Sequence, residues 1–166
     1  MSLRTPALVC IVSLVASAQP ARGASTAPGA RPPSVADAHI LLTLLQTLLS
    51  EPLLKARRFW RTELTEGMSL ADFESRFPKG SEGYEHFLNM IAFWETTGSL
   101  MQRGLVNEDL AFDTFLDAPP WKKVERIFKE KRARDKQPLE AVNFEWIAGR
   151  AAQWIARHER EMQRRR

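Results

Sequence analysis

The sequence predicts an all-α protein, a single-domain antiparallel bundle of about five to six helices. Apolar residues recur at helical spacing along most of the chain, and no stretch between turn signals alternates as a strand does. The composition suits a packed core, because 44% of the residues are hydrophobic and 27% are charged. Five tryptophans and nine phenylalanines supply the bulk for that core.

Residues 1–33 are predicted to lie outside the bundle. Residues 1–18 have the features of a secretory signal peptide, since Arg4 precedes an apolar run and Ala16-Ser17-Ala18 matches a cleavage site. The run is short for a membrane span, which needs roughly 20 apolar residues. Residues 19–33 are rich in Ala, Pro, Gly and Ser, and are predicted to form a flexible linker. We therefore expect residues 34–166 to fold as the helical domain of an exported protein, periplasmic or secreted, which stays membrane-anchored if the leader is not cleaved.

Caps and helix breakers set the expected helices of this domain. Ser34 or Asp37 caps the first helix, Gly104 ends the longest one, and Asn107 caps the helix that follows. The stretches expected to be helical are 34–49, 52–66, 69–77, 81–103, 107–116, from 121 to the residues before Pro138, and 139–162. Ser50-Glu51-Pro52 marks a break or a kink, and with a kink the first two stretches form one helix. The leucines of the first stretch cover more than one face, so this helix is either buried on two sides or lies near lipid.

The longest predicted helix carries a carboxylate on its apolar face. The apolar and small residues that recur at helical spacing are Tyr84, Phe87, Leu88, Ile91, Gly98 and Met101. Glu95 falls on the same face, so we expect it to be a buried charge that pairs with an arginine and fixes helix register beside a close crossing at Gly98. The alternative interpretation makes Glu95 a general base or metal ligand in a hydrolase site.

Two further surfaces are candidates for binding. Trp146, Arg150 and Trp154 follow one another at four-residue steps, which places the guanidinium between two indoles, either as an aromatic–cation surface or as packing at the edge of the core. A basic patch is formed by Lys122, Lys123, Arg126, Lys129, Arg132, Arg134, Arg164, Arg165 and Arg166. This patch either binds nucleic acid or anionic lipid, or is a solvated and frayed helix end.

The charge distribution bears on these alternatives. The whole chain has a formal charge of +4, whereas residues 63–117 carry a net charge of −8 and residues 122–136 a net charge of +5. Acidic and basic helices of opposite net charge are expected to neutralise each other across a bundle. Export also fits poorly with nucleic-acid binding, and no nucleic-acid motif accompanies the charges.

Sequence motifs point to no particular enzyme class. The chain has no G-x-S-x-G elbow, P-loop or dinucleotide-binding glycine pattern. Its three histidines are scattered outside any H-E-x-x-H arrangement, and its one cysteine, Cys10, lies in the predicted leader. We therefore expect no metal and no cofactor, and a non-enzymatic function is favoured over an enzymatic one.

Four features follow one another in the central part of the chain: the E-x-x-G-x-L run from Glu95 to Leu100, the turn at Gly104, the aromatic helix around Phe112 and the basic helix that Trp121 opens. In these features the chain resembles an uncharacterised bacterial helical family. Members of this family often have a hydrophobic N-terminal segment, so the resemblance implies envelope association and implies no chemistry. The expected function is that of an envelope-associated or secreted protein that acts through protein–protein interaction.

Overall fold

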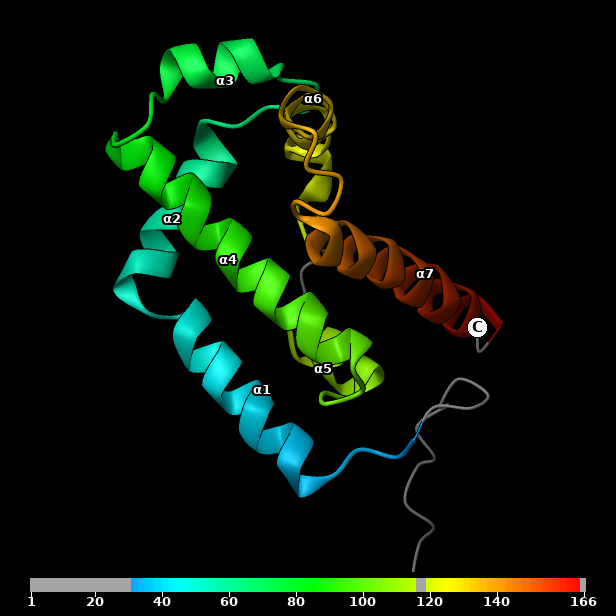
Figure 1. The fold of residues 1–166 in the computed structure, drawn as a ribbon. Helices are drawn as coiled ribbons and strands as arrows, with labels where there is room; N and C mark the ends of the chain where they lie inside the picture. Colours follow the sequence, from blue (N-terminus) through cyan, green and yellow to red (C-terminus); the bar gives the residue numbers. More distant parts are fainter. Residues whose placement is uncertain (1–30, 116–118, 165–166) are drawn as a thin grey trace, which may run out of the picture.

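The computed structural model describes residues 31–115 and 119–164. All regular elements in this part of the chain are helical, which confirms the predicted all-α class (Figure 1). They are α1 (Val35–Leu48), α2 (Glu51–Thr62), α3 (Leu70–Arg76), α4 (Glu82–Gln102), α5 (Glu108–Phe115), the 3-10 turn η1 (Trp121–Lys123), α6 (Glu125–Asp135) and α7 (Val142–Arg164). The seven α-helices slightly exceed the predicted five to six. The predicted signal peptide, residues 19–30 of the predicted linker, residues 116–118, Arg165 and Arg166 lie outside the described residues.

Helix α4 is the centre of the bundle. It crosses the molecule with α2 on one side and α7 on the other, and these two pairs make the most extensive helix–helix contacts (Figure 1). Aromatic rings fill the space between them: Trp94 of α4 stacks with Phe144 of α7 at a centroid distance of 6.1 Å, and Phe87 stacks with Trp60 of α2 at 5.6 Å. Aromatic packing therefore joins α4 to both of its neighbours, and both ring burial and ring geometry stabilise these contacts.

The buried face of α4 matches the predicted one only in part, since Phe87, Gly98 and Met101 are buried as predicted. Leu88 is 46% exposed and Ile91 is only partly buried, whereas Met90, Trp94 and Thr97 are buried. A single stripe suits one neighbouring helix, but α4 packs against both α2 and α7. Two neighbours bury a wider arc of the helix, and this arc includes positions that a single stripe leaves out.

The connections around α6 also differ from the prediction. Trp121 opens a 3-10 turn, and the α-helix begins only at Glu125. The last helix begins at Val142, three residues after the predicted start, because the chain passes through left-handed conformations at Lys136 (φ 53°) and Ala141 (φ 56°). Left-handed residues end a helix or delay the next one, and sequence pattern locates them poorly when they are not glycine.

Within the described ranges, no helix has both the length and the apolarity to cross a membrane.

Candidate functional site

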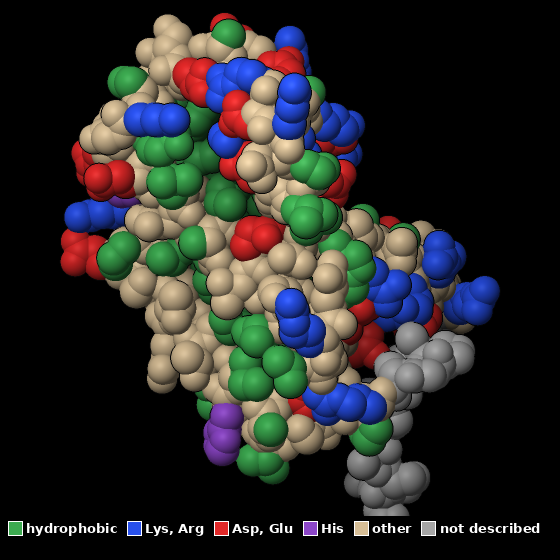
Figure 2. Space-filling model, in the orientation of Figure 1, with side chains coloured by type: hydrophobic (Ala, Val, Ile, Leu, Met, Phe, Trp, Pro, Cys, Tyr) green, Lys and Arg blue, Asp and Glu red, His purple; other side chains and the backbone are tan. Residues whose placement is uncertain are grey.

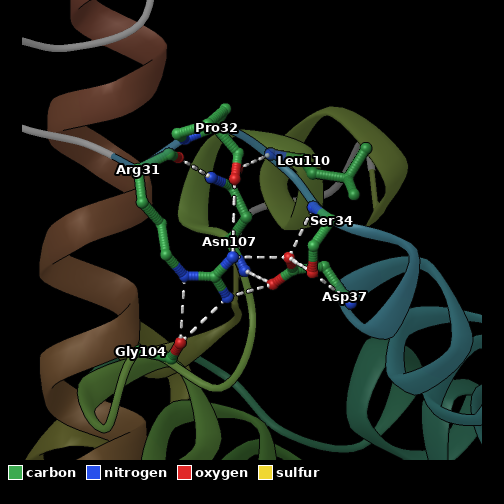
Figure 3. A network of polar contacts seen from close by, with 7 residues as sticks. All are labelled: Arg31, Pro32, Ser34, Asp37, Gly104, Asn107 and Leu110. Carbon is green, nitrogen blue, oxygen red and sulfur yellow. Dashed lines mark hydrogen bonds and ion pairs between the residues drawn. The ribbon is translucent and has the colours of Figure 1, made fainter.

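A buried carboxylate joins the start of α1 to the start of α5 (Figure 3). Asp37 is completely buried. Its two oxygens accept hydrogen bonds from the Arg31 guanidinium at 2.7 and 2.5 Å. They also accept from the backbone N–H and the hydroxyl of Ser34, at 2.7 and 2.5 Å, and from the backbone N–H of Asn107 at 2.7 Å. Arg31 also donates to the carbonyl of Gly104 at 2.9 Å. Ser34 is the N-cap of α1, and with Asp37 it forms a capping box.

The other end of this network caps α5. The side-chain oxygen of Asn107 accepts from the backbone N–H of Leu110 (2.9 Å), and its amide donates to the carbonyl of Arg31 (2.7 Å). Arg31, followed by the hydrogen bonds from Ser34 and Asn107, holds the pKa of the Asp37 carboxyl well below its usual range despite burial. A carboxylate with so many donors stays ionised and stationary, so its role is structural. The sequence predicts both caps, but it does not predict that they share one carboxylate or that Arg31, in the predicted linker, contacts the domain.

Glu95 holds the start of α7. One of its oxygens accepts from the backbone N–H of Phe144 at 2.7 Å, and the other accepts from the side-chain amide of Asn143 at 3.0 Å. Gly98 lies one turn further along α4, where a Cβ atom would come within 2.3 Å of the Asn143 carbonyl oxygen. The half-buried Glu95 thus meets a helix N-terminus, where a negative charge is stabilised, in place of the expected arginine.

Arg150 contacts a carboxylate on α5. Its guanidinium donates to both oxygens of Glu108, at 2.9 and 2.8 Å, which is a bidentate ion pair between α7 and α5. Trp154 stacks with His158 at 3.8 Å and lies near Phe112. The structure therefore brings this part of α7 against α5, and the ion pair gives Arg150 a role other than stacking between two indoles.

Most cations of the predicted basic patch that fall in the described residues have partners. Lys123 donates to three backbone carbonyls at the end of α2, at 2.9 to 3.1 Å. Its neighbours on α6 form ion pairs, which are Arg126–Glu130, Lys129–Glu125, Arg132–Glu145 and Arg134–Glu74. Lys122 and Arg164 are exposed. Acidic and basic side chains intermingle over α3 and α6 (Figure 2), so this region has no broad face of one sign in that view.

Helix α1 has an apolar face outside the core. Leu41, Leu44 and Leu48 are buried against the bundle. About a third of a turn away lies a second row, which we call the α1 seam: Val35 (74% exposed), Ala38, Leu42 (56%), partly buried Leu45 and Leu49 (55%). The steps of three, four, three and four residues are those of the a and d positions of a coiled coil. The predicted excess of leucines over one face therefore corresponds to two rows on α1, one buried in the core and one, the α1 seam, largely exposed.

The structure contains no cluster of three or more His, Cys, Asp or Glu side chains suited to a metal ion, as far as residues 31–115 and 119–164 show. The acidic residues that sequence analysis singled out are engaged in helix caps and ion pairs.

Comparison with known families identifies a match over most of the chain. Residues 36–154 match a family described as a domain of unknown function (DUF4760). Neither the curated proteins nor the solved structures yield a match.

Proposed function

Because the chain belongs to the DUF4760 family, whose function is unknown, we propose a function from its surface. The protein is a non-enzymatic helical protein, envelope-associated or secreted, that acts through protein–protein interaction. The α1 seam is its contact surface. The observation that carries this proposal is the row of exposed apolar residues at coiled-coil spacing on α1. Large apolar side chains exposed in one row are typical of an interaction surface.

The occupant we propose for the α1 seam is the same helix of a second copy. A row of a and d positions packs best against another row of the same spacing, and two copies of one seam meet by two-fold symmetry. The exposed flanking positions on one side are His39 and Gln46, and the other side is the buried face of α1. With neither Lys, Arg, Asp nor Glu at these flanking positions, fixed like-charge repulsion does not oppose the pairing of two copies.

Substitution of Leu42 and Leu49 tests this surface. Sedimentation equilibrium of the wild-type protein from about 1 to 500 µM should show the average mass rising from that of the monomer towards twice that value. The double substitution Leu42→Glu and Leu49→Glu should weaken association by at least about 100-fold, because burial of a leucine side chain stabilises by about 1.5–3 kcal/mol.

Leu139→Glu is the matched control, since Leu139 is 75% exposed and lies off α1. It should associate as the wild type does. Helical circular dichroism should be the same in all three proteins, because every substituted side chain is exposed. A wild type that stays monomeric at 500 µM, or a double variant that associates as the wild type does, would remove the α1 seam as a contact between copies.

Export is the second part of the proposal. It is supported by the pattern of residues 1–18, in which a charge, an apolar run and a small-x-small site follow in order. A copy with a C-terminal tag, expressed in bacteria and fractionated, should appear in the periplasm or medium shortened by about 18 residues. A full-length product in the cytosol would contradict export.

The alternatives have less support from the geometry. A basic face that binds nucleic acid or anionic lipid would need free cations, and those of α6 largely lie in ion pairs. Binding to RNA or to anionic vesicles that falls steeply with salt would favour it. A hydrolase centred on Glu95 would need a carboxylate open to substrate, but both oxygens of Glu95 accept hydrogen bonds from the start of α7.

A further inference from the structure

A groove lies between α1 and α4, which run side by side (Figure 1). Its volume is about 540 Å³, which falls within the roughly 300–1,000 Å³ range of small-molecule sites. Its floor and walls are apolar side chains, of which Leu44, Leu53 and Phe93 are buried and Ile40 and Leu100 are partly buried. The groove therefore offers a continuous apolar surface to an occupant from outside the bundle.

The lining carries no charged side chain among the described residues. Its polar members are Thr43, Thr47, Asn89 and Thr96. The hydroxyls of Thr43 and Thr47 donate to backbone carbonyls one turn earlier in α1, at 3.1 and 2.9 Å. A charged or strongly polar ligand would give up its hydrogen bonds to water here without gaining partners of equal strength, which is costly. The lining therefore favours an uncharged, apolar occupant.

The dimensions of the groove separate the apolar occupants from one another. At 1.5 Å per residue, the lining extends over about 10 Å of α1, from Ile40 to Thr47, and over about 16 Å of α4, from Asn89 to Leu100. A volume of about 540 Å³ spread over that length leaves a channel about 6–7 Å wide, whereas an α-helix with its side chains is about 10–12 Å wide. An extended peptide would bring backbone N–H and C=O groups, for which this lining has few partners. A single alkyl chain meets both limits.

We propose that this groove binds one unbranched alkyl chain of about 8–12 carbons, the tail of a single-chain amphiphile whose head group stays in water. An extended chain advances by roughly 1.3 Å per carbon, because its C–C bonds are about 1.5 Å long, so a tail of this length matches the lining. The groove and the α1 seam lie on opposite sides of the buried face of α1. The site therefore stands whether or not two copies associate.

Calorimetric titration with octyl maltoside and decyl maltoside, each below its micelle concentration, tests the proposal. Each methylene group that leaves water should tighten binding about fourfold, so decyl maltoside should bind about 15-fold more tightly than octyl maltoside. Maltose, which is the head group without a tail, should not bind. Equal affinities for the two tails, or absence of binding at about 1 mM decyl maltoside, would overturn the proposal.

Ala92→Trp tests whether the tail lies in this groove. Ala92 is an exposed residue of α4 that lines the groove, so an indole at this position should fill the channel and abolish binding of decyl maltoside. Ala133→Trp is the matched control, because Ala133 is exposed on α6 and does not line the groove. It should bind as the wild type does, and helical circular dichroism should be the same in all these proteins. An Ala92→Trp variant that binds as tightly as the wild type would overturn the proposal.

The α1 seam is the other apolar surface that could bind a tail, and the double substitution Leu42→Glu and Leu49→Glu removes it. This variant should bind decyl maltoside as the wild type does, and loss of binding would overturn the groove as the site. Methyl nuclear magnetic resonance adds a direct readout. The signals of Ile40 should shift on addition of decyl maltoside, whereas those of Ile127 and Ile147, which are buried in the core and do not line the groove, should stay in place. Unmoved Ile40 signals would contradict binding in the groove.

Discussion

Asp37→Asn is expected to lower the free energy of unfolding by about 3 kcal/mol at pH 7. The substitution keeps the size of the side chain but removes the charge that the Arg31 guanidinium and the other donors approach. It also puts an N–H donor in place of one acceptor oxygen, so either the backbone N–H of Asn107 or the Ser34 donors lose their partner in a buried setting. Removing one partner from a buried charge network costs about 3–5 kcal/mol, and the half-exposed Arg31 places the expected loss at the lower end. Urea unfolding measures it.

The same carboxylate gives stability an acid dependence with a definite sign. The folded-state pKa of Asp37 lies well below the value of about 3.9 for an unfolded chain, chiefly because Arg31 donates to it. Its contribution is therefore fully present above about pH 4–5 and is lost as the pH falls through the folded-state pKa. The wild type should lose stability between pH 5 and pH 2 more steeply than Asp37→Asn. Because Asp135, whose pKa is lowered to about 2, titrates in both proteins, the difference between the two curves isolates Asp37.

Asp113→Asn is the control for this pair of measurements. Asp113 is exposed on α5, so its replacement should change the unfolding free energy by less than about 0.5 kcal/mol. If Asp37→Asn unfolded at the same urea concentration as Asp113→Asn, the network in Figure 3 would not contribute to stability.

In the Asp37 network, the sequence predicts the local helix caps but not the contacts between residues far apart in the chain. Ser34 and Asn107 each carry a local capping signal, and the structure places both at helix starts. The contact between Asp37 and Asn107 joins residues 70 positions apart, and nothing local specifies it. Arg31 lies in a stretch whose composition is typical of a linker, and only the folded arrangement shows that its side chain contacts Asp37. Caps follow from short-range backbone geometry, whereas shared partners depend on how the helices dock.

The partner of Glu95 also depends on how the helices dock. Its position on an apolar face marked it as a side chain that needs a polar partner, and the most familiar partner for a carboxylate is an arginine. The start of α7 takes that place because the left-handed Ala141 turns the chain so that the backbone N–H of Phe144 faces α4. Unpaired N–H groups at a helix start are strong donors, but they can be predicted as partners of a carboxylate only when the first residue of the helix is known to within one residue. The long-range ion pairs, such as Arg134 with Glu74, likewise required the docking of α6 on α3.

Gly98→Ala is expected to destabilise the protein by about 1–3 kcal/mol, although alanine is the better helix former. At this position α4 and α7 come so close that a Cβ atom would lie 2.3 Å from the carbonyl oxygen and 2.9 Å from the carbonyl carbon of Asn143. The obstacle is backbone, which cannot rotate away, so α7 has to move. That movement separates Glu95 from the backbone N–H of Phe144, and the amide of Phe144 should exchange with solvent faster in the variant.

Gly149→Ala separates the effect of helix propensity from that of the close crossing. Gly149 lies inside α7, and a Cβ atom there would meet no atom within 4 Å. This substitution should stabilise the protein by about 0.5–1 kcal/mol, since it removes only the backbone entropy of glycine. The two variants make the same chemical change in the two helices that cross, so opposite signs in urea unfolding would identify the α4–α7 contact as the cause. If both variants gained stability, α4 and α7 would not approach as closely as the structure has them.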